Sequence, residues 1–263
     1  MEVKEMLFMN KGDGENSYAK SAEVTEKVAA ETQAIVYKVV ESVLKEKCGD
    51  QILNIADLGC AADEKGLPLN KGRIYISEST PPAILKAYVS QFEEDFLLFL
   101  KCRSPEMVPN GRIILIINAR KSDDPIGRES IHYWELLSKA IVSLVSQGLI
   151  GEEELDSFNV PIHTPSQDEV EELVKKEGSF TIEFIELLDI DLAGVWSSPQ
   201  AKVKTVRAFS EPLISHQFGD KKVMDKLYDK VTEMLIEDYK KEKPETMKNV
   251  SLVAVLKKKD TLT

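Results

Sequence analysis

The residues of this chain best suited to chemistry follow a short, largely apolar segment, residues 51–58, in the sequence Asp57-Leu58-Gly59-Cys60. The segment has the length of a buried strand. An acidic residue and a glycine at the end of such a strand are typical of a Rossmann-type sheet that binds a nucleotide-like ligand across its carboxyl edge. Gly59 would let the ligand approach the backbone because glycine has no Cβ. Many α/β proteins also have a glycine after a strand, so this motif alone leaves a purely structural role open.

Other short motifs occur before and after this segment, in a distinctive order. Met9-Asn10, two glycines and Ser17-Tyr18-Ala19-Lys20 precede it by one long helical pattern. The downstream motifs are Trp134-Glu135-Leu136-Leu137, Leu155-Asp156-Ser157-Phe158-Asn159 with Pro161, Thr164-Pro165-Ser166, Glu169-Val170, Arg207, Glu211-Pro212 and Phe218-Gly219. In this order the chain resembles the plant S-adenosylmethionine-dependent carboxyl methyltransferases, the salicylate, jasmonate and theobromine methyltransferase (SABATH) family, over residues 1–62 and about 68–258.

One departure from the family pattern is large. The family continues from its Leu-Gly-Cys strand through a Ser-Ser-Gly-Pro-Asn turn and a long central region to a segment like Leu69-Asn70-Lys71-Gly72. Here residues 60–66 make that connection directly. Three strand–helix units amount to roughly 100 residues, at about 30 or more each. We therefore expect a central block of that size to be absent.

The resemblance implies an α/β fold, a Rossmann-like methyltransferase sheet with a helical cap, from which the central strands are deleted. We expect one domain over residues 1–263. Residues 1–20 would form a lid, 21–62 and 68–150 the remaining core, 151–218 mostly the cap, and 219–263 a C-terminal helix and strand.

Hydrophobic periodicity and turn residues predict the individual elements. Ser166 with Glu169 forms a capping box at the start of a helix that ends at Gly178. The continuous aliphatic run 113–117 predicts a strand buried on both faces, as in a parallel sheet. The remaining expected elements are helices at 21–47, from 79 onward, 129–147, 199–216 and 220–243, strands at 72–76, 180–190 and 250–256, and a short acidic turn at 151–155.

Composition limits the partners of the chain. Its 263 residues include 34 Lys and Arg against 45 Asp and Glu, a net charge of −11. Such a surface repels phosphate backbones and anionic lipid, so we expect neither nucleic acid nor a membrane as partner. Three separated cysteines suit a reducing compartment, and no signal-length or membrane-length apolar run is visible. The expectation is a soluble cytoplasmic protein that is prone to association, with a homodimer as one such assembly.

The resemblance implies that Ser17 and Asp57 bind S-adenosylmethionine, the methyl donor. Asp57 would accept hydrogen bonds from the donor's amino group and offset part of its positive charge; the alternative is a carboxylate that caps the next helix. The family's turn asparagine and its ribose-binding acidic residue fall in the missing block. Methyl transfer to a carboxylate is an in-line displacement by a nucleophile that is already charged at neutral pH. It depends on positioning and desolvation, so no catalytic base is predicted.

For the acceptor, the resemblance implies a pocket formed by Tyr18, Thr25, Trp134 and His163. Two of these positions depart from the family, which has Gln at Thr25 and an aromatic residue at His163. The shorter Thr25 side chain weakens the case for carboxylate capture there. Trp134 begins an apolar helix, so packing in the core is an equal alternative for it.

Asn70, Asp156, Phe158 and Asn159 match a Mg²⁺ site of some family members. A carboxylate, two amide oxygens and a backbone carbonyl are suitable ligands for this hard cation. The alternative is a turn held by side-chain-to-backbone hydrogen bonds of the Asx type.

The function implied by the resemblance is S-adenosylmethionine-dependent O-methylation of small carboxylic acids, such as jasmonate, salicylate or benzoate, impaired by the missing block. The alternative is a non-catalytic family product that acts, if at all, as a binding or dimerisation partner. A dinucleotide oxidoreductase is disfavoured, because no Gly-x-Gly-x-x-Gly follows the first strand: Cys60, Ala61 and Ala62 come directly after Gly59.

Overall fold

The computed structural model describes residues 22–46, 70–126, 128–160, 162–219, 221–241 and 248–260. The expected first strand and the predicted site residues Ser17, Tyr18 and Asp57 lie outside these ranges. The described elements, in chain order, are α1 (Glu23–Glu46), α2 (Pro82–Glu106), β1 (Arg112–Asn118), α3 (Arg128–Ser146), α4 (Glu152–Asp156), α5 (Gln167–Glu177), β2 (Phe180–Asp191), α6 (Pro199–Phe218), α7 (Lys221–Lys241) and β3 (Lys248–Lys258).

The described strands form a single sheet in the order β1-β3-β2. β3 is antiparallel to both neighbours and is buried along most of its length, with Ala254 opposite Leu115 on one side and Ile185 on the other. A bulge between Ile182 and Phe184 shifts the register of β2. β1 and β2 are therefore parallel to each other, separated by the central C-terminal strand.

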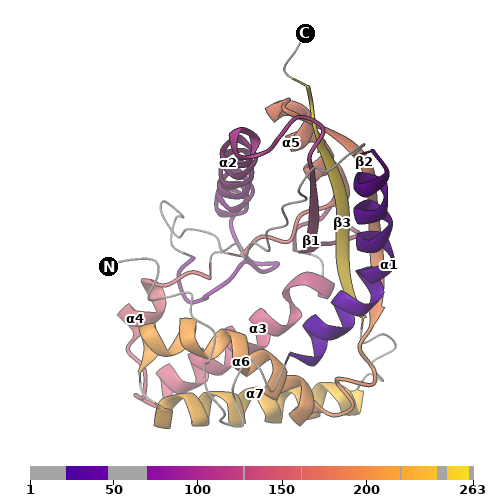
Figure 1. The fold of residues 1–263 in the computed structure, drawn as a ribbon. Helices are drawn as coiled ribbons and strands as arrows, with labels where there is room; N and C mark the ends of the chain where they lie inside the picture. The colour runs from indigo at the N-terminus through magenta and orange to yellow at the C-terminus, as the bar shows by residue number, and fades with distance from the viewer. Residues whose placement is uncertain are drawn as a thin grey trace.

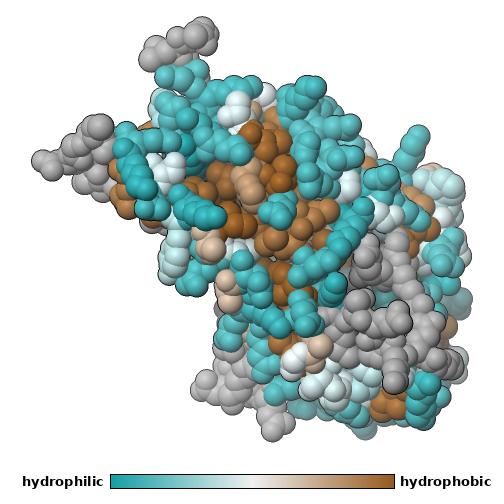
Figure 2. All heavy atoms as spheres, turned by 90° about the vertical axis from the view of Figure 1, so that its right-hand side faces the viewer, coloured by the Kyte–Doolittle hydropathy of each residue, from teal (hydrophilic) through white to brown (hydrophobic). Residues whose placement is uncertain are grey.

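Helices cover the sheet from two sides, as Figure 1 shows, with α2 on the left of the strands and α1 on the right. Side chains of α2, α5 and the sheet form one apolar core, which includes Phe96, Leu173 and Leu252. The end of α1 is tied to the sheet by Arg112, whose Nη2 lies 2.6 Å from Glu46 Oε1 and whose Nε lies 2.6 Å from Glu183 Oε2. The face that carries α1 shows a patch of apolar side chains bordered by hydrophilic ones (Figure 2).

A second layer, made of α3, α4, α6 and α7, lies below the sheet in Figure 1. Its core is separate from that of the sheet and contains Leu137, Ile141, Leu227 and Val231. Ser198 caps α6 by accepting a hydrogen bond from the N–H of Ala201, and Pro199 occupies the first turn, where its missing N–H costs nothing. α2 joins the two layers, because Tyr88 packs in the lower core and Phe96 in the upper one.

Most predicted helices are confirmed to within a few residues, but two strand predictions are wrong. Residues 72–76 form no strand: Ile74, Tyr75 and Ile76 are at most 2% exposed, in an irregular segment. β1 is a strand, but it is not buried on both faces. Its neighbour among the described strands is β3, and Ile116 is 38% exposed. Within the described ranges, no helix is long and apolar enough to cross a membrane.

Candidate acceptor site

The irregular segment 70–80 is fastened along the loop 156–164, and both contain predicted site residues. The backbone N–H of Asn70 donates to Asn159 Oδ1 at 3.3 Å, and that of Gly72 donates to Asp156 Oδ1 at 2.7 Å. Further along, Val160 N donates to the carbonyl of Ile74 at 2.7 Å. The segment is thus hydrogen-bonded along the loop and does not form part of the sheet.

Three of the four predicted metal ligands are brought together by these contacts, namely Asn70, Asp156 and Asn159. Asn70 donates its amide Nδ2 to the carbonyl of Tyr75 at 2.8 Å, which leaves its amide oxygen as the other polar atom of that side chain. Phe158 has a buried side chain, so only its carbonyl could serve as a ligand. The candidate ligands therefore all present oxygen atoms, the type of ligand that Mg²⁺ requires. Asp156 Oδ1 and Asn159 Oδ1 already accept backbone N–H groups, so the geometry also fits the alternative of a turn held by side chains.

Trp134 lies on α3 inside an aromatic cluster, and only 7% of it is exposed. Its ring centroid is 5.8 Å from that of Tyr75, 5.8 Å from that of Tyr133 and 6.2 Å from that of Phe209. Tyr75 in turn meets Tyr88 edge to face at 6.0 Å. Trp134 therefore packs as a core residue among groups from α2, α3, α6 and the 70–80 segment, and these same aromatic faces would shape an apolar acceptor site.

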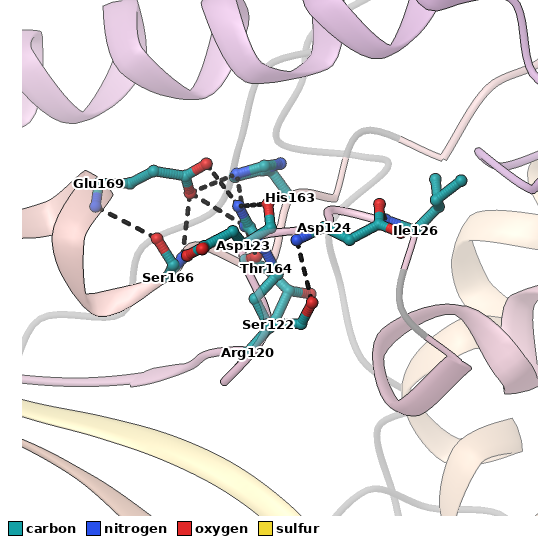
Figure 3. Close-up of polar contacts among 9 residues, drawn as sticks. All are labelled: Arg120, Ser122, Asp123, Asp124, Ile126, His163, Thr164, Ser166 and Glu169. Atoms are coloured by element: carbon teal, nitrogen blue, oxygen red, sulfur yellow. Dashed lines mark hydrogen bonds and ion pairs between the residues drawn. The ribbon is translucent and has the colours of Figure 1, made fainter.

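His163 lies against the ion pair of Arg120 and Glu169 (Figure 3). Its Nε2 is 3.0 Å from Glu169 Oε2 and 3.3 Å from Arg120 Nη1. A carboxylate only accepts hydrogen bonds, so Nε2 donates to it. The ring also packs on Phe92, with centroids 4.8 Å apart. His163 thus combines a hydrogen bond to a carboxylate with an aromatic contact.

The ion pair itself joins Arg120, at the end of β1, to Glu169 on α5. Arg120 is 2% exposed, and its Nη2 and Nη1 reach the two Glu169 oxygens at 2.5 and 2.9 Å. Burial by itself would raise the pKa of the Glu169 carboxyl, but hydrogen bonds from His163 and Arg120 outweigh it and hold the pKa at about 2. The carboxylate stays charged at any physiological pH.

Of the remaining predicted residues, one lies on α1 and three lie outside the described ranges. Thr25 is exposed in the first turn of α1, the helix that packs on β2 and β3. Ser17, Tyr18 and Asp57 are outside the described residues. A surface hollow of about 440 Å³ is lined by Lys221, Lys222, Asp225, Lys226 and Asp229, all on α7, and none of these is a predicted site residue. Within the described ranges, no three His, Cys, Asp or Glu side chains cluster as a metal site.

Sequence reasoning missed Tyr75 and Arg120. The sequence predicts a strand at residues 72–76, and in a strand alternate side chains point to opposite faces. Arg120 follows an aliphatic run inside a polar stretch, and nothing local in the sequence distinguishes a buried arginine there from a solvated one. The capping box that identified Glu169 was the available signal, because a carboxylate at that position is fixed by Ser166 and can bind a second group.

Comparison with known proteins shows the family of the chain. The chain matches the profile of the S-adenosylmethionine-dependent carboxyl methyltransferases in two segments, residues 4–67 and 61–259. It is 40% identical to a probable 7-methylxanthine methyltransferase of Theobroma cacao over 365 positions, covering 100% of this chain and 99% of that protein. It is 35% identical to a probable caffeine synthase of Camellia sinensis over 366 positions, covering 98% and 99% of the two chains.

The solved structure of a loganic acid methyltransferase with S-adenosylhomocysteine superposes with a TM-score of 0.68 and 32% identity. The match covers 76% of this chain but only 56% of the solved one. An alignment of 365 positions also leaves at least 102 without a counterpart in a chain of 263 residues, which agrees with the expected missing block. On this evidence the chain belongs to the plant S-adenosylmethionine-dependent carboxyl methyltransferase (SABATH) family, in a shortened form.

Proposed function

We propose that this chain methylates the carboxylate of a small organic acid with S-adenosylmethionine, at a rate far below that of complete family members. The family assignment supports the donor and the reaction type. In the reaction, an acceptor oxygen attacks the methyl carbon in line while the sulfonium sulfur leaves as a thioether, so the acceptor gains a methyl group and the donor becomes S-adenosylhomocysteine. No proton has to be removed from a carboxylate.

The chain's own contribution on the acceptor side would be positioning and exclusion of water. Tyr75 and Trp134, which pack against each other and are 2% and 7% exposed, are the apolar groups that we assign to the acceptor side. Removing the carboxylate from water raises its reactivity, because a poorly solvated anion attacks the methyl carbon more readily. We assign Trp134 to this role, and Thr25 and Tyr18 remain predicted acceptor contacts.

The observation that carries the proposed loss of rate is the exposure of β1. A complete doubly wound sheet flanks such an aliphatic strand on both sides. Here β3 is its neighbour among the described strands, and Ile116 is 38% exposed. The family's next strand and its ribose-binding carboxylate belong to the block that has no counterpart in this chain. We therefore expect the affinity for S-adenosylmethionine to be reduced more than any other property of the site.

A xanthine ring nitrogen is the second candidate acceptor, because the relatives at 40% identity carry names of 7-methylxanthine methyltransferases. The named acceptors of the relatives thus include both a purine base and a carboxylic acid. A non-catalytic role as a binding or dimerisation partner is the third candidate, and the exposed apolar side of β1 favours it.

The decisive experiment combines donor titration by calorimetry with a transfer assay. The purified chain is incubated with labelled S-adenosylmethionine and, separately, with jasmonate, salicylate, benzoate, indole-acetate, loganic acid and 7-methylxanthine. Measurable donor binding with slow ester formation would support the proposal. Turnover near 1 per second, or even a hundredth of that, is typical of a working enzyme and would contradict the loss of rate. Absence of donor binding would favour the non-catalytic role, and methylation of 7-methylxanthine alone would favour the second candidate.

A further inference from the structure

We propose that Arg207 and Glu211 are positioning residues of the acceptor site. They fix the turn of α6 that carries Phe209, and Phe209 in turn sets the orientation of the Trp134 ring. The inference rests on the proposed function for the meaning of the site, but its geometry can be tested without turnover. Arg207 and the dipeptide Glu211-Pro212 are motifs of the sequence to which the proposed reaction assigns no part.

Pro212 lies inside α6 and weakens the helix at the turn before it. Proline has no N–H, so the carbonyl of Ala208 loses the donor that a regular helix would supply four residues further on. Ser210 adds to this effect, because its hydroxyl donates to the carbonyl of Val206 at 2.8 Å, and such bonds often bend a helix. The direction of α6 at this turn therefore depends on contacts outside the helix backbone.

Arg207 supplies such contacts across the weakened turn. Its Nε and Nη2 donate to the two carboxylate oxygens of Glu211 at 2.9 and 2.8 Å, and both side chains are largely buried. The same Nη2 lies 2.6 Å from Asp225 Oδ1 on α7, and the guanidinium carbon lies 4.9 Å from the ring centroid of Tyr228. A planar guanidinium binds a carboxylate in this bidentate way with strong directional preference, so it fixes the turn relative to α7.

A hydrogen bond between two buried hydroxyls ties the same turn to α7. The hydroxyl oxygens of Tyr228 and Ser210 lie 2.9 Å apart, and both residues are buried. The single hydroxyl hydrogen of Ser210 points to Val206, so Tyr228 is the donor in this pair. Tyr228 therefore contacts Arg207 through its ring and Ser210 through its hydroxyl, on either side of Phe209 in the sequence.

Phe209 joins this turn to the aromatic cluster on the acceptor side. Its ring meets the Trp134 ring edge to face, with centroids 6.2 Å apart and an angle of 67° between the planes. Phe209 is 39% exposed, so of these two rings it presents the more accessible surface to a dissolved acceptor. Because Phe209 lies within the turn that Arg207 holds, a change in the direction of α6 there moves its ring relative to Trp134.

The competing explanation is that the ion pair only stabilises the packing of α6 on α7. Arg207→Lys separates the two explanations, because lysine keeps the charge but cannot form the bidentate pair. A contribution to packing alone would appear in the melting temperature and would leave the surroundings of Trp134 unchanged. A positioning role would change the Trp134 spectrum and the acceptor affinity together.

The test uses the full chain in a Trp196→Phe background, in which Trp134 is the remaining one of the two tryptophans. Arg207→Lys and Asp225→Asn weaken the ion pair, whereas Phe209→Leu removes the ring contact without touching that pair. Each ion-pair substitution is made with and without Phe209→Leu, so that the variants form double-mutant cycles.

Lys139→Gln is the matched control. It breaks an exposed ion pair with Glu135, also between residues four apart, on the helix that carries Trp134. Every variant is measured for Trp134 emission, near-ultraviolet circular dichroism and melting temperature. Calorimetry with S-adenosylmethionine, salicylate and 7-methylxanthine then gives donor and acceptor affinities separately.

We expect Arg207→Lys and Asp225→Asn to change the Trp134 signals, while Lys139→Gln leaves them unchanged. The dissociation constant of the bound acceptor should rise roughly two- to tenfold, the range expected when an edge-to-face contact between two rings is lost, with donor affinity unchanged. In the Phe209→Leu chain the same two substitutions should have no further effect on either measurement, because the ring through which they act is gone.

Unchanged Trp134 signals in folded Arg207→Lys and Asp225→Asn would overturn the inference. An equal effect of these substitutions with and without Phe209→Leu would also overturn it, as would changed signals with an unchanged affinity for a bound acceptor. If Arg207→Lys fails to fold, Asp225→Asn decides alone, since the Asp225 side chain is 44% exposed. If the parent chain binds no acceptor, the proposed function fails, and the spectroscopic cycles still decide this inference.

Discussion

Gly72 donates its backbone N–H to Asp156 Oδ1 at 2.7 Å, although 84 residues separate them in the sequence. Together with the bond from Asn70 N to Asn159 Oδ1, this contact fastens the segment that follows the shortened part of the chain to the loop after α4. Because Tyr75 lies three residues beyond Gly72, the same fastening places the aromatic residue that meets Trp134.

We predict that Asp156→Ala destabilises the chain by about 1.5–3 kcal/mol, because it removes a charged acceptor and leaves the Gly72 N–H unpaired in a half-buried place. Urea unfolding followed by circular dichroism measures this. Glu153→Ala is the control, since Glu153 is an exposed carboxylate on the same short helix. Equal, small effects of both substitutions would show that the hydrogen bond between Gly72 and Asp156 contributes nothing to the free energy of unfolding.

Magnesium should act through the same residues. We predict that excess Mg²⁺ slightly raises the melting temperature and that EDTA lowers it, because a cation that binds only the folded state stabilises it by mass action. The Asp156→Ala chain should show no such difference, since it lacks the carboxylate of the set. Identical melting curves of the parent chain with Mg²⁺ and with EDTA would leave the hydrogen-bonded turn as the whole explanation of Asn70, Asp156 and Asn159.

Trp134 offers a prediction that separates binding from packing. Trp134→Ala should cost about 3–5 kcal/mol, because a large buried side chain is removed. Trp134→Phe keeps most of the volume, so we expect a smaller loss of stability but a clear loss of acceptor affinity, with donor affinity retained. Calorimetric titration of both ligands measures the difference. A parallel decrease in both affinities would identify Trp134 as a core residue without a specific role.

The parts of this fold that could be predicted from the sequence are those fixed by local chemistry. Ser166 and Glu169 made the start of α5 predictable, and Gly178, with φ of 88°, made its end predictable, because residues other than glycine rarely adopt that conformation. β1 was predictable as a strand because residues 113–117 form a continuous aliphatic run.

The parts that could not be predicted depend on distant partners. The apolar run at Ile74, Tyr75 and Ile76 looks like a strand, but its backbone is bound by the loop after α4 instead of by a sheet. The burial of β1 was overestimated because the sequence does not reveal which neighbours remain. The buried position of Arg120 could not be predicted, because its partner, Glu169, lies 49 residues away.

The carboxylate of Glu169 predicts a pH dependence of stability. Its pKa is about 2 in the folded chain, against an ordinary value of 4.5, so folding favours the ionised form. Its contribution is therefore fully present above about pH 4.5 and is lost as the pH falls toward 2. Urea unfolding at several pH values in this window should show a shallower decline for Glu169→Gln than for the parent chain. The exposed control Glu172→Gln should follow the parent, and a Glu169→Gln curve parallel to the parent curve would contradict the assignment.

The last prediction concerns association through β1. Ile116 lies opposite Val253 in the sheet and is 38% exposed, and the run from Ile113 to Ile117 has no charged residue that would discourage pairing with another chain. Exposed apolar strands promote association between copies, and a lysine placed in such a strand prevents it. We expect sedimentation to show concentration-dependent self-association of the parent chain, and we expect Ile116→Lys to shift the population toward monomer while circular dichroism stays unchanged. Leu98→Lys is the matched control, because Leu98 is an exposed apolar residue on α2. If both substitutions reduce association equally, general surface hydrophobicity is the cause. A parent chain that stays monomeric at all concentrations would show that the apolar side of β1 is not an interface, and the dimerisation role would lose its support.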